Sequence, residues 1–264
     1  MGFSFDERVT VKLDPEKARK SIQSAFYEWS SIDCPDGTGM ADMRFVQLDD
    51  VSCRVSAYNG KAPNVNVVLF QDDSWKYRGE DNTLAKTTVT FDPATGEILD
   101  ADIEINTAIN PVTVRDPVPG PDGFDPKVKY DLQSLMTHEI GHFLGIAHSP
   151  YPDATMFASY SPGSTDLRTI SDDDREALCA AYPPGRGAFC APAPRGGLLL
   201  DCARLPQETP KVEGCSVGAP GRDGRAVPCA CGSACRSGDF RGLLPSAILL
   251  GLLARRRRRL PPHS

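Results

Sequence analysis

Long apolar segments and an export signal at the start are both lacking in this sequence. The opening residues MGFSFDERVT are polar and have none of the apolar stretch of a signal peptide. Either the protein's true start lies upstream, which we favour, or the protein stays inside the cell. The main apolar run, residues 243–254, is interrupted by Pro245. As a helix it would span about 18 Å, well short of the roughly 30 Å hydrocarbon core of a bilayer. The run therefore predicts only a transient membrane contact.

Basic residues are scarce in the first two thirds of the chain. Residues 1–183 carry 16 Lys and Arg against 30 Asp and Glu, a net charge of −14, whereas residues 184–264 carry 13 against 5, a net charge of +8. An acidic body disfavours nucleic acid as a partner, because phosphate binding requires clustered positive charge. The hydrophobic content of 40% suffices for one sizeable core with an appendage.

Paired C-x-x-C knuckles, which are typical of zinc ribbons, are also lacking, although the chain has nine cysteines. Seven of them lie within the 57 residues from Cys179 to Cys235, in a segment rich in proline, glycine and arginine. This pattern favours a disulfide-stapled extracellular segment, because disulfides persist outside the cytosol. The full connectivity stays open, and the odd number leaves at least one thiol unassigned. Cys34 and Cys53 are placed to close the loop between them.

Histidine is scarce too, and its distribution is uneven. Three of the four histidines fall in the stretch THEIGHFLGIAHS, residues 137–149, with the spacing H-E-x-x-H-x-x-G-x-x-H. His138 and His142 are four residues apart, so on a helix both rings project from one face and can bind one metal ion at about 2.0–2.1 Å. Gly145 lets the chain leave the helix in a left-handed conformation, which brings His148 back as a third ligand.

Three histidines leave the fourth position of a tetrahedral zinc ion open to water, which is typical of a catalytic site. Glu139 follows the first ligand directly and can reach that water without binding the metal. We expect Glu139 to take the water's proton during attack on a scissile carbonyl and to deliver it to the leaving amine. A polar helix face with solvated or core histidines is the weaker interpretation, because the motif fixes five positions over eleven residues.

Local patterns also predict the elements around this motif. Asp14 and Pro15 open a helix that is expected to run to about Ser30. Its buried stripe comprises Ile22, Ala25, Phe26 and Trp29. Strands are expected at residues 8–13, 43–47, 51–56, 65–70, 86–91 and 97–106. Among them, residues 65–70 form a nearly continuous apolar run that suits a central strand.

The second half of the domain is predicted to be helical around the motif and at its end. A loop rich in proline and glycine, residues 110–126, precedes the metal-binding helix, which is expected to start near Tyr130 or Asp131. Ser171 opens a last helix through a capping box, and the aspartates at 172–174 suit its positive end. Pro183–Pro184 stop this helix. We therefore predict a catalytic domain at 1–183, a Cys/Pro/Gly-rich linker at 184–238 and a terminal segment at 239–264.

The motif HEIGHFLGIAHS, with Met156 in ATMFASY beyond it, resembles the metzincin zinc proteases and, among them, the matrixins. Ser149 after the third histidine and the closing segment ISDDDREALCAAYP are similar to the same family. The resemblance covers about residues 8–183. It implies a zincin-like α/β fold, with a twisted mixed sheet and about three helices, one catalytic zinc ion, and a Met-turn at Met156 beneath the histidines. It also implies that DADIEIN, residues 100–106, is the edge strand that pairs with an extended substrate.

The chain departs from the family's pattern in several places. No histidine is left in the domain for a second, structural zinc ion, and the cysteine switch of the family's propeptide is missing. Phe157 and Ala158 replace a common Tyr-Pro pair, which leaves Tyr160 as the candidate for the wall of the primed-side specificity pocket. An acidic loop lies where family members bind calcium, and either Ca²⁺ binding or a solvated loop explains it; its residues are Asp72, Asp73, Glu80 and Asp81.

Together these features predict a monomeric, zinc-dependent endopeptidase that is secreted or anchored at the cell surface and hydrolyses extracellular proteins or peptides. A non-catalytic zinc-containing surface module is the main alternative, and a zinc amidase acting on cell-wall peptides is a weaker one. The apolar run near the C-terminus, followed by Arg255–Arg259, resembles the sorting signals of myxobacteria, which implies export and then processing or anchoring. A weak membrane anchor is the other interpretation of this tail.

Overall fold

A mixed β-sheet forms the centre of the molecule. The computed structural model describes residues 1–77, 83–114, 129–187, 191–204 and 214–218. Within them the sheet has six strands in the order β2-β1-β3-β5-β4-β8. They are β1 (Gly2–Phe5), β2 (Val46–Gln47), β3 (Val67–Phe70), β4 (Thr83–Phe91), β5 (Ile98–Ile105) and β8 (Gly214–Gly218). The pairs from β2 to β5 are parallel, whereas β4 is antiparallel to both β5 and β8.

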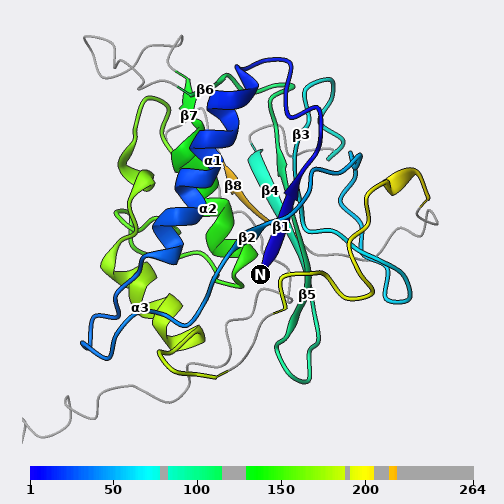
Figure 1. Cartoon of the computed structure of the whole chain (residues 1–264). Helices are drawn as coiled ribbons and strands as arrows, with labels where there is room; N and C mark the ends of the chain where they lie inside the picture. The colour runs from blue at the N-terminus through cyan, green and yellow to red at the C-terminus, as the bar shows by residue number, and fades with distance from the viewer. Residues whose placement is uncertain (78–82, 115–128, 188–190, 205–213, 219–264) are drawn as a thin grey trace, which may run out of the picture.

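Two helices pack side by side on one face of this sheet (Figure 1). They are α1 (Pro15–Ser30) and α2 (Leu132–Phe143), and a third helix, α3 (Asp172–Ala181), closes the domain. The predicted start of α1 is confirmed, because Asp14 accepts a hydrogen bond from the Lys17 amide at 2.9 Å. Its expected apolar stripe is buried, and the Trp29 indole donates to the Thr137 carbonyl at 2.7 Å. This contact fixes α1 against α2.

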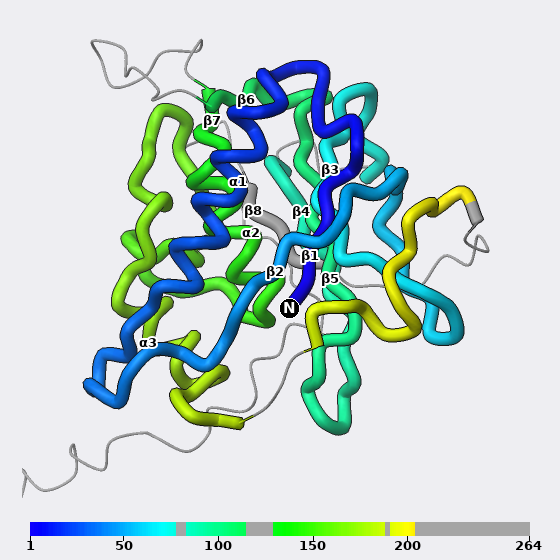
Figure 2. The backbone as a smooth tube through the Cα atoms, in the orientation of Figure 1, coloured from blue at the N-terminus to red at the C-terminus, as the bar shows by residue number. Residues whose placement is uncertain are grey.

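The opposite face of the sheet has a smaller apolar cluster. Strand β3 contributes to both sides, with Val68 and Phe70 in the main core and Val67 and Leu69 in the second cluster. The prediction of a central strand within residues 65–70 is therefore confirmed. Residues 191–204 return across this second face (Figure 2), where they form backbone bridges from Leu198 to Asn64 and from Asp201 to Ser52. The α/β class, the mixed sheet and the three helices agree with the sequence.

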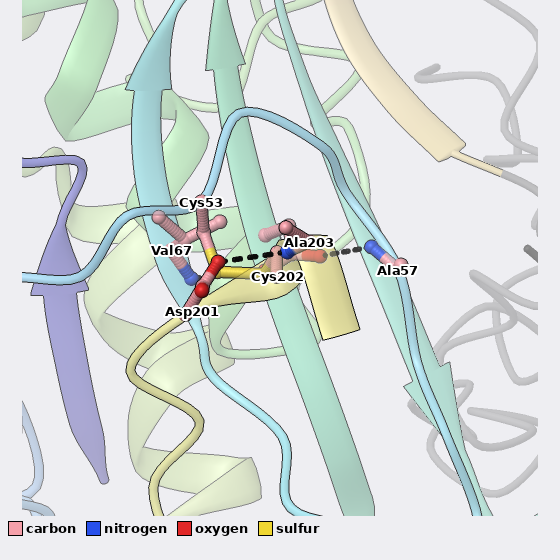
Figure 3. The surroundings of a disulfide bond; sticks show 7 residues. Cys53, Ala57, Val67, Asp201, Cys202 and Ala203 are labelled. Carbon is pink, nitrogen blue, oxygen red and sulfur yellow. Dashed lines mark hydrogen bonds between the residues drawn. A yellow bond between two sulfur atoms is a disulfide. The ribbon is translucent and has the colours of Figure 1, made fainter. Parts of the chain in front are cut away.

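The disulfide pairing differs from the expectation. Cys34 pairs with Cys179 of α3, and Cys53 pairs with Cys202, so the predicted Cys34–Cys53 bridge is wrong. Figure 3 shows Cys53 and Cys202 beside Val67 of β3, with Asp201 and Ala203 flanking the second cysteine. Each bridge spans a large sequence separation, 145 and 149 residues respectively, which local spacing does not reveal. The second bridge ties the segment after the domain to the back of the sheet.

Of the three strands predicted near the N-terminus, those at residues 8–13 and 51–56 are wrong. Residues 8–13 form a turn, in which Val9 has a φ of 49° and the buried Asp72 carboxylate accepts hydrogen bonds from the Thr10 hydroxyl and the Val11 amide, each at 2.8 Å. The first strand is instead β1, at Gly2–Phe5. Of the strands expected at 43–47 and 51–56, only β2 and isolated bridges at Val51 and Ser52 form.

The position of β5 corrects the expected edge strand. Residues 100–106 do not lie at an edge, because β5 is paired with β3 on one side and β4 on the other. The acidic side chains of this strand are buried on the second face, where Asp102 accepts hydrogen bonds from the amides of Val67 at 2.9 Å and Ala57 at 3.0 Å. Burial raises the pKa of Asp102 to about 7. The strand next to α2 is β4.

Several predictions lie wholly or partly outside the described residues. They concern the 110–126 loop beyond Val114, Glu80 and Asp81 of the acidic loop, most of the 184–238 segment after Arg204, and the apolar run with its arginines. No helix in the described part of the chain is long and apolar enough to cross a membrane. Strands β6 (Val112–Thr113) and β7 (Tyr130–Asp131) pair in parallel immediately before α2.

Candidate metal centre

Helix α2 positions the first two histidines. It begins at the predicted place, where Asp131 accepts a hydrogen bond from the Ser134 amide at 2.9 Å and forms an ion pair with Arg168 at 2.8 Å. The helix ends through Gly145, whose φ of +82° suits glycine. The amide of Gly145 donates to His142 O at 2.8 Å, and the amide of Ile146 donates to Gly141 O at 2.9 Å. This left-handed ending turns the chain back toward the helix.

The three predicted histidines converge on one point. The Nε2 atom of His142 lies 3.2 Å from that of His138 and 3.1 Å from that of His148. Nitrogen ligands about 2.0–2.1 Å from a tetrahedral zinc ion are separated by about 3.3 Å, so these distances fit a shared ion. In the described part of the chain, these residues are the one group of at least three metal-ligand side chains with clustered ligand atoms.

The other ring nitrogens bind backbone carbonyls. Nδ1 of His138 lies 2.7 Å from Thr155 O, and Nδ1 of His142 lies 2.8 Å from Ile146 O. A carbonyl only accepts, so each Nδ1 carries the proton and each Nε2 presents its lone pair to the centre. Burial lowers the pKa of His138 to about 3 and that of His148 to about 4, and it lowers the pKa of His142 well below its usual value. This neutral donor set fits Zn²⁺.

Met156, the residue proposed for a Met-turn, lies against Gly141 of α2. A Cβ atom added to Gly141 would lie 2.1 Å from the Met156 Sδ atom, so only glycine permits this close approach. The Ser149 amide donates to Met156 O at 2.8 Å, which links the third-ligand segment to the turn. Met156 is fully buried and belongs to the main core. Its role here is therefore structural.

Asp174 supports this turn, which was not anticipated. The sequence placed it at the positive end of α3, and it does accept from the Ser171 hydroxyl at 2.6 Å. The same carboxylate also accepts from the amides of Thr155 at 2.6 Å and Met156 at 3.2 Å. Since Thr155 holds His138, Asp174 connects the closing helix to a metal ligand. The buried state of Asp174, which raises its pKa, is the signal that distinguishes it from the exposed Asp172.

Glu139 is fully buried on α2, beside the histidine cluster and facing β4. The hydroxyl of Thr87 on β4 lies 2.5 Å from Glu139 Oε2 and 3.1 Å from the Glu139 carbonyl oxygen. This contact holds the carboxylate in place next to the ligands. Nothing in the sequence pattern of β4 pointed to Thr87, because the partners are 52 residues apart.

A cleft of about 650 Å³ opens beside the centre. Its lining includes His142 and His148, the β4 residues Val89 and Phe91, and Ile98 of β5. The walls near the histidines are therefore largely apolar, which suits apolar side chains of a bound molecule.

Tyr160 lies in the loop beyond Met156 and is buried. Its hydroxyl donates to Ser164 O at 2.5 Å and accepts from the Asp131 amide at 3.1 Å, while its ring packs on Tyr130. Burial raises the pKa of Tyr160 to about 12. Tyr160 thus joins this loop to the start of α2, and it is not among the residues that line the cleft beside the histidines.

The acidic loop, for which Ca²⁺ binding and solvation were the two interpretations, includes one residue with another role. Asp72 accepts hydrogen bonds from Thr10, Val11 and the Thr107 hydroxyl, the last at 2.5 Å, so its oxygens join the N-terminal turn to the end of β5. Asp72 is therefore a buried structural carboxylate and not a solvated one. Asp73 is exposed, in keeping with a solvated residue.

Several known proteins are similar to this chain in sequence. Metalloendoproteinase 4-MMP of Arabidopsis thaliana is 26% identical over 170 residues, which are 63% of this chain and 41% of that protein. Probable matrix metalloproteinase 095L of Invertebrate iridescent virus 3 is 34% identical over 120 residues, 44% of this chain and 29% of the relative. Human neutrophil collagenase is 25% identical over 181 residues, which are 66% of this chain and 30% of that protein. The chain thus spans less than half of each relative.

The family model for matrixins matches residues 2–183. This range contains the sheet strands β1 to β5, the three helices, the histidine cluster and the Met156 turn. The match therefore covers well over half of the chain and all of the candidate centre. The chain belongs to the matrixin family.

Proposed function

We propose that this protein is a zinc-dependent endopeptidase. The observation that carries the proposal is the convergence of the three histidine Nε2 atoms. The Nδ1 atoms of His138 and His142 donate to backbone carbonyls, which fixes these two rings as neutral ligands. Glu139 lies next to this cluster on the same helix. A structural zinc site needs a fourth protein ligand and has no use for such a carboxylate.

When bound, Zn²⁺ supplies a positive charge that lowers the pKa of a bound water to about 7 and stabilises negative charge on a carbonyl oxygen. Glu139 accepts the proton of the attacking water and then delivers it to the leaving amine. Thr87 keeps the Glu139 carboxylate oriented through its hydroxyl. His138 and His142 hold their orientations through Thr155 and Ile146.

The substrate is an extended peptide that pairs with the outer edge of β4. This strand faces α2, and its Thr87 contacts Glu139, so a peptide on that edge passes the catalytic carboxylate. Main-chain pairing on an edge strand accepts many sequences, and selectivity then comes from side-chain subsites. We assign the apolar cleft beside Val89 and Phe91 to one substrate side chain. Tyr160, which joins the loop beyond Met156 to the start of α2, is kept as the candidate for a wall of the primed-side pocket.

We infer that the substrates are extracellular proteins or peptides. Both described disulfides hold distant parts of the domain together, and such bonds persist in oxidising compartments. A domain that depends on Cys34–Cys179 and Cys53–Cys202 is suited to work outside the cytosol.

The test replaces Glu139 with glutamine in the full chain. Glu139→Gln should retain one bound zinc ion per chain but lose casein hydrolysis, because an amide cannot accept the water's proton. Glu176→Gln, on the exposed side of α3, is the matched control and should behave like the wild type. Zinc content and casein cleavage are measured with and without a chelator. Hydrolysis by Glu139→Gln at the wild-type rate would refute the mechanism, and zinc binding without any hydrolysis by the wild type would favour a binding module.

A further inference from the structure

The outer edge of β4 carries a strand from the C-terminal part of the same chain. Strand β8, residues 214–218, pairs antiparallel with β4, with Cys215 opposite Thr87 and Gly218 opposite Thr83. Figure 1 shows β8 between α2 and β4, and β8 also contacts α2. Sequence patterns gave no sign of this strand. It occupies the edge that we assigned to the substrate.

The register places β8 directly across from the catalytic carboxylate. Thr87 is the β4 residue whose hydroxyl contacts Glu139, and Cys215 is its partner in the ladder. The pairing ends with Gly214 opposite Thr88, while the next residues, Val89 and Phe91, line the cleft beside the histidines. A substrate strand cannot pair with residues 83–88 while β8 is there. The strand therefore blocks one half of the β4 edge and leaves the other half as a cleft.

We propose that residues 214–218 are an intramolecular competitor of the substrate, bound to the outer edge of β4. This inference rests on the proposed function for its consequence, because the competition matters only if substrates pair with β4. The interaction is a backbone ladder, so it requires no particular side chain in the blocking segment. Glu139 and His138 have no exposed surface in the full chain, in keeping with a covered centre.

Residues 214–218 form a weak strand, but their attachment to the domain keeps them close to β4. The segment Gly-Cys-Ser-Val-Gly has glycine at both ends, and each glycine costs a strand about 0.5–1 kcal/mol relative to alanine. The Cys53–Cys202 disulfide anchors the chain on the back of the sheet, 12 positions before Gly214. A short tether gives an effective concentration on the order of millimolar. A peptide substrate must compete with this effective concentration of β8 to bind β4.

The strand can be removed without deleting any part of the chain. Proline lacks the amide hydrogen that a ladder requires, so Ser216→Pro combined with Val217→Pro disrupts β8 whichever of the two amides faces β4. The control carries Val227→Pro with Ser233→Pro, which makes the same two changes outside residues 214–218. Peptide mapping without reduction verifies that both variants retain the Cys34–Cys179 and Cys53–Cys202 disulfides.

The kinetic result expected is a change in KM alone. If β8 is in place nine-tenths of the time, it raises the KM of a competing peptide about tenfold. The β8 variant should therefore lower the KM for a quenched peptide taken from a casein cleavage site about tenfold, with kcat unchanged, whereas the control should match the wild type. A third variant, Cys215→Ser, should also match the wild type. If Cys215→Ser lowered the KM as much as the β8 variant does, the proposal would be overturned, because the thiol and not the backbone ladder would then block the site.

Hydrogen exchange provides a readout that does not depend on hydrolysis. In the Glu139→Gln background, the amides of residues 83–88 that point away from β5 should exchange faster in the β8 variant than in the control. Faster exchange, together with no hydrolysis by the chain that retains Glu139, would support the strand while refuting the endopeptidase. Unchanged exchange, or unchanged KM in an active enzyme, would refute the blocking strand and leave the proposed function standing.

Discussion

Gly141 packs against Met156 beneath the histidine cluster, and this contact predicts the effect of one added methyl group. In Gly141→Ala the new Cβ would lie 2.1 Å from Met156 Sδ, 2.8 Å from Met156 Cε and 3.0 Å from Trp29 Cζ2. Both neighbours are fully buried, and Trp29 is held by its hydrogen bond to Thr137. The methyl group can therefore be accommodated only if the buried Met156 side chain, or the turn that carries it, moves.

Two opposing free energies set the size of this effect. Overpacking a dense core costs about 1–3 kcal/mol, whereas alanine is about 1 kcal/mol better than glycine inside a helix. We expect Gly141→Ala to lower the free energy of unfolding of the metal-free protein by up to about 2 kcal/mol. A displaced turn also moves Thr155 O, the partner of His138 Nδ1, and loss of such an orienting contact weakens metal binding by about 10–100-fold.

A double-mutant cycle isolates the contact. Met156→Ala alone costs about 2–5 kcal/mol, but it removes both sulfur and methyl from the path of the new group. In that background Gly141→Ala should be neutral or stabilising by up to about 1 kcal/mol. Urea unfolding in a chelator measures stability, and competition with a chelating dye measures zinc affinity. If Gly141→Ala is as costly in the Met156→Ala background as in the wild type, the clash is not its cause.

Three further predictions concern the groups around the centre. Thr87→Val should lower kcat/KM at least about tenfold, because a hydrogen bond to a charged group is worth about 1.5–3 kcal/mol, and Thr87→Ser should restore most of it. Asp174→Ala leaves two buried amides unsatisfied and should cost about 2–5 kcal/mol in urea unfolding, whereas Asp172→Ala, which is exposed, should cost under about 0.5 kcal/mol. The pKa of each buried histidine is lowered in the folded, metal-free protein, so the unfolded chain binds protons that the folded chain does not. Its stability should fall as pH drops from about 6.5 toward about 4, by up to about 1.4 kcal/mol per unit for each histidine, and His142→Ala should show a shallower slope in urea midpoints taken in a chelator.

The sequence was informative where the physical cause of a structure is local. The caps at Asp14, Asp131 and Ser171 and the left-handed Gly145 each depend on residues within one or two turns, and all four are in place. The histidine spacing is informative for the same reason, since a helix and a single reversal bring all three rings together. The apolar run around β3 was also sufficient to predict a strand buried on both faces.

Contacts between residues far apart in the sequence could not be predicted in this way. The turn at residues 8–13 has an alternating pattern, but its amide and hydroxyl groups bind Asp72, more than 60 positions away. Cys34 and Cys53 were close enough in sequence to suggest a bridge. Instead Cys34 pairs with Cys179 within α3, and Cys53 pairs with Cys202 after α3. Neither partner could be identified without knowing where the last segments of the chain return.

The misplaced substrate edge has a related cause, and it bears on how the centre is controlled. Both β4 and β5 read as strands, but only their order in the sheet decides which one faces the substrate, and that order is set by the crossover from β3. Once β4 is outermost within the family domain, its free edge must be paired, covered or solvated. Residues 214–218 have little strand propensity of their own, so it is the edge of β4 that makes them a strand. An edge able to order so weak a segment is able to order a peptide substrate, and competition between the two follows from the same ladder.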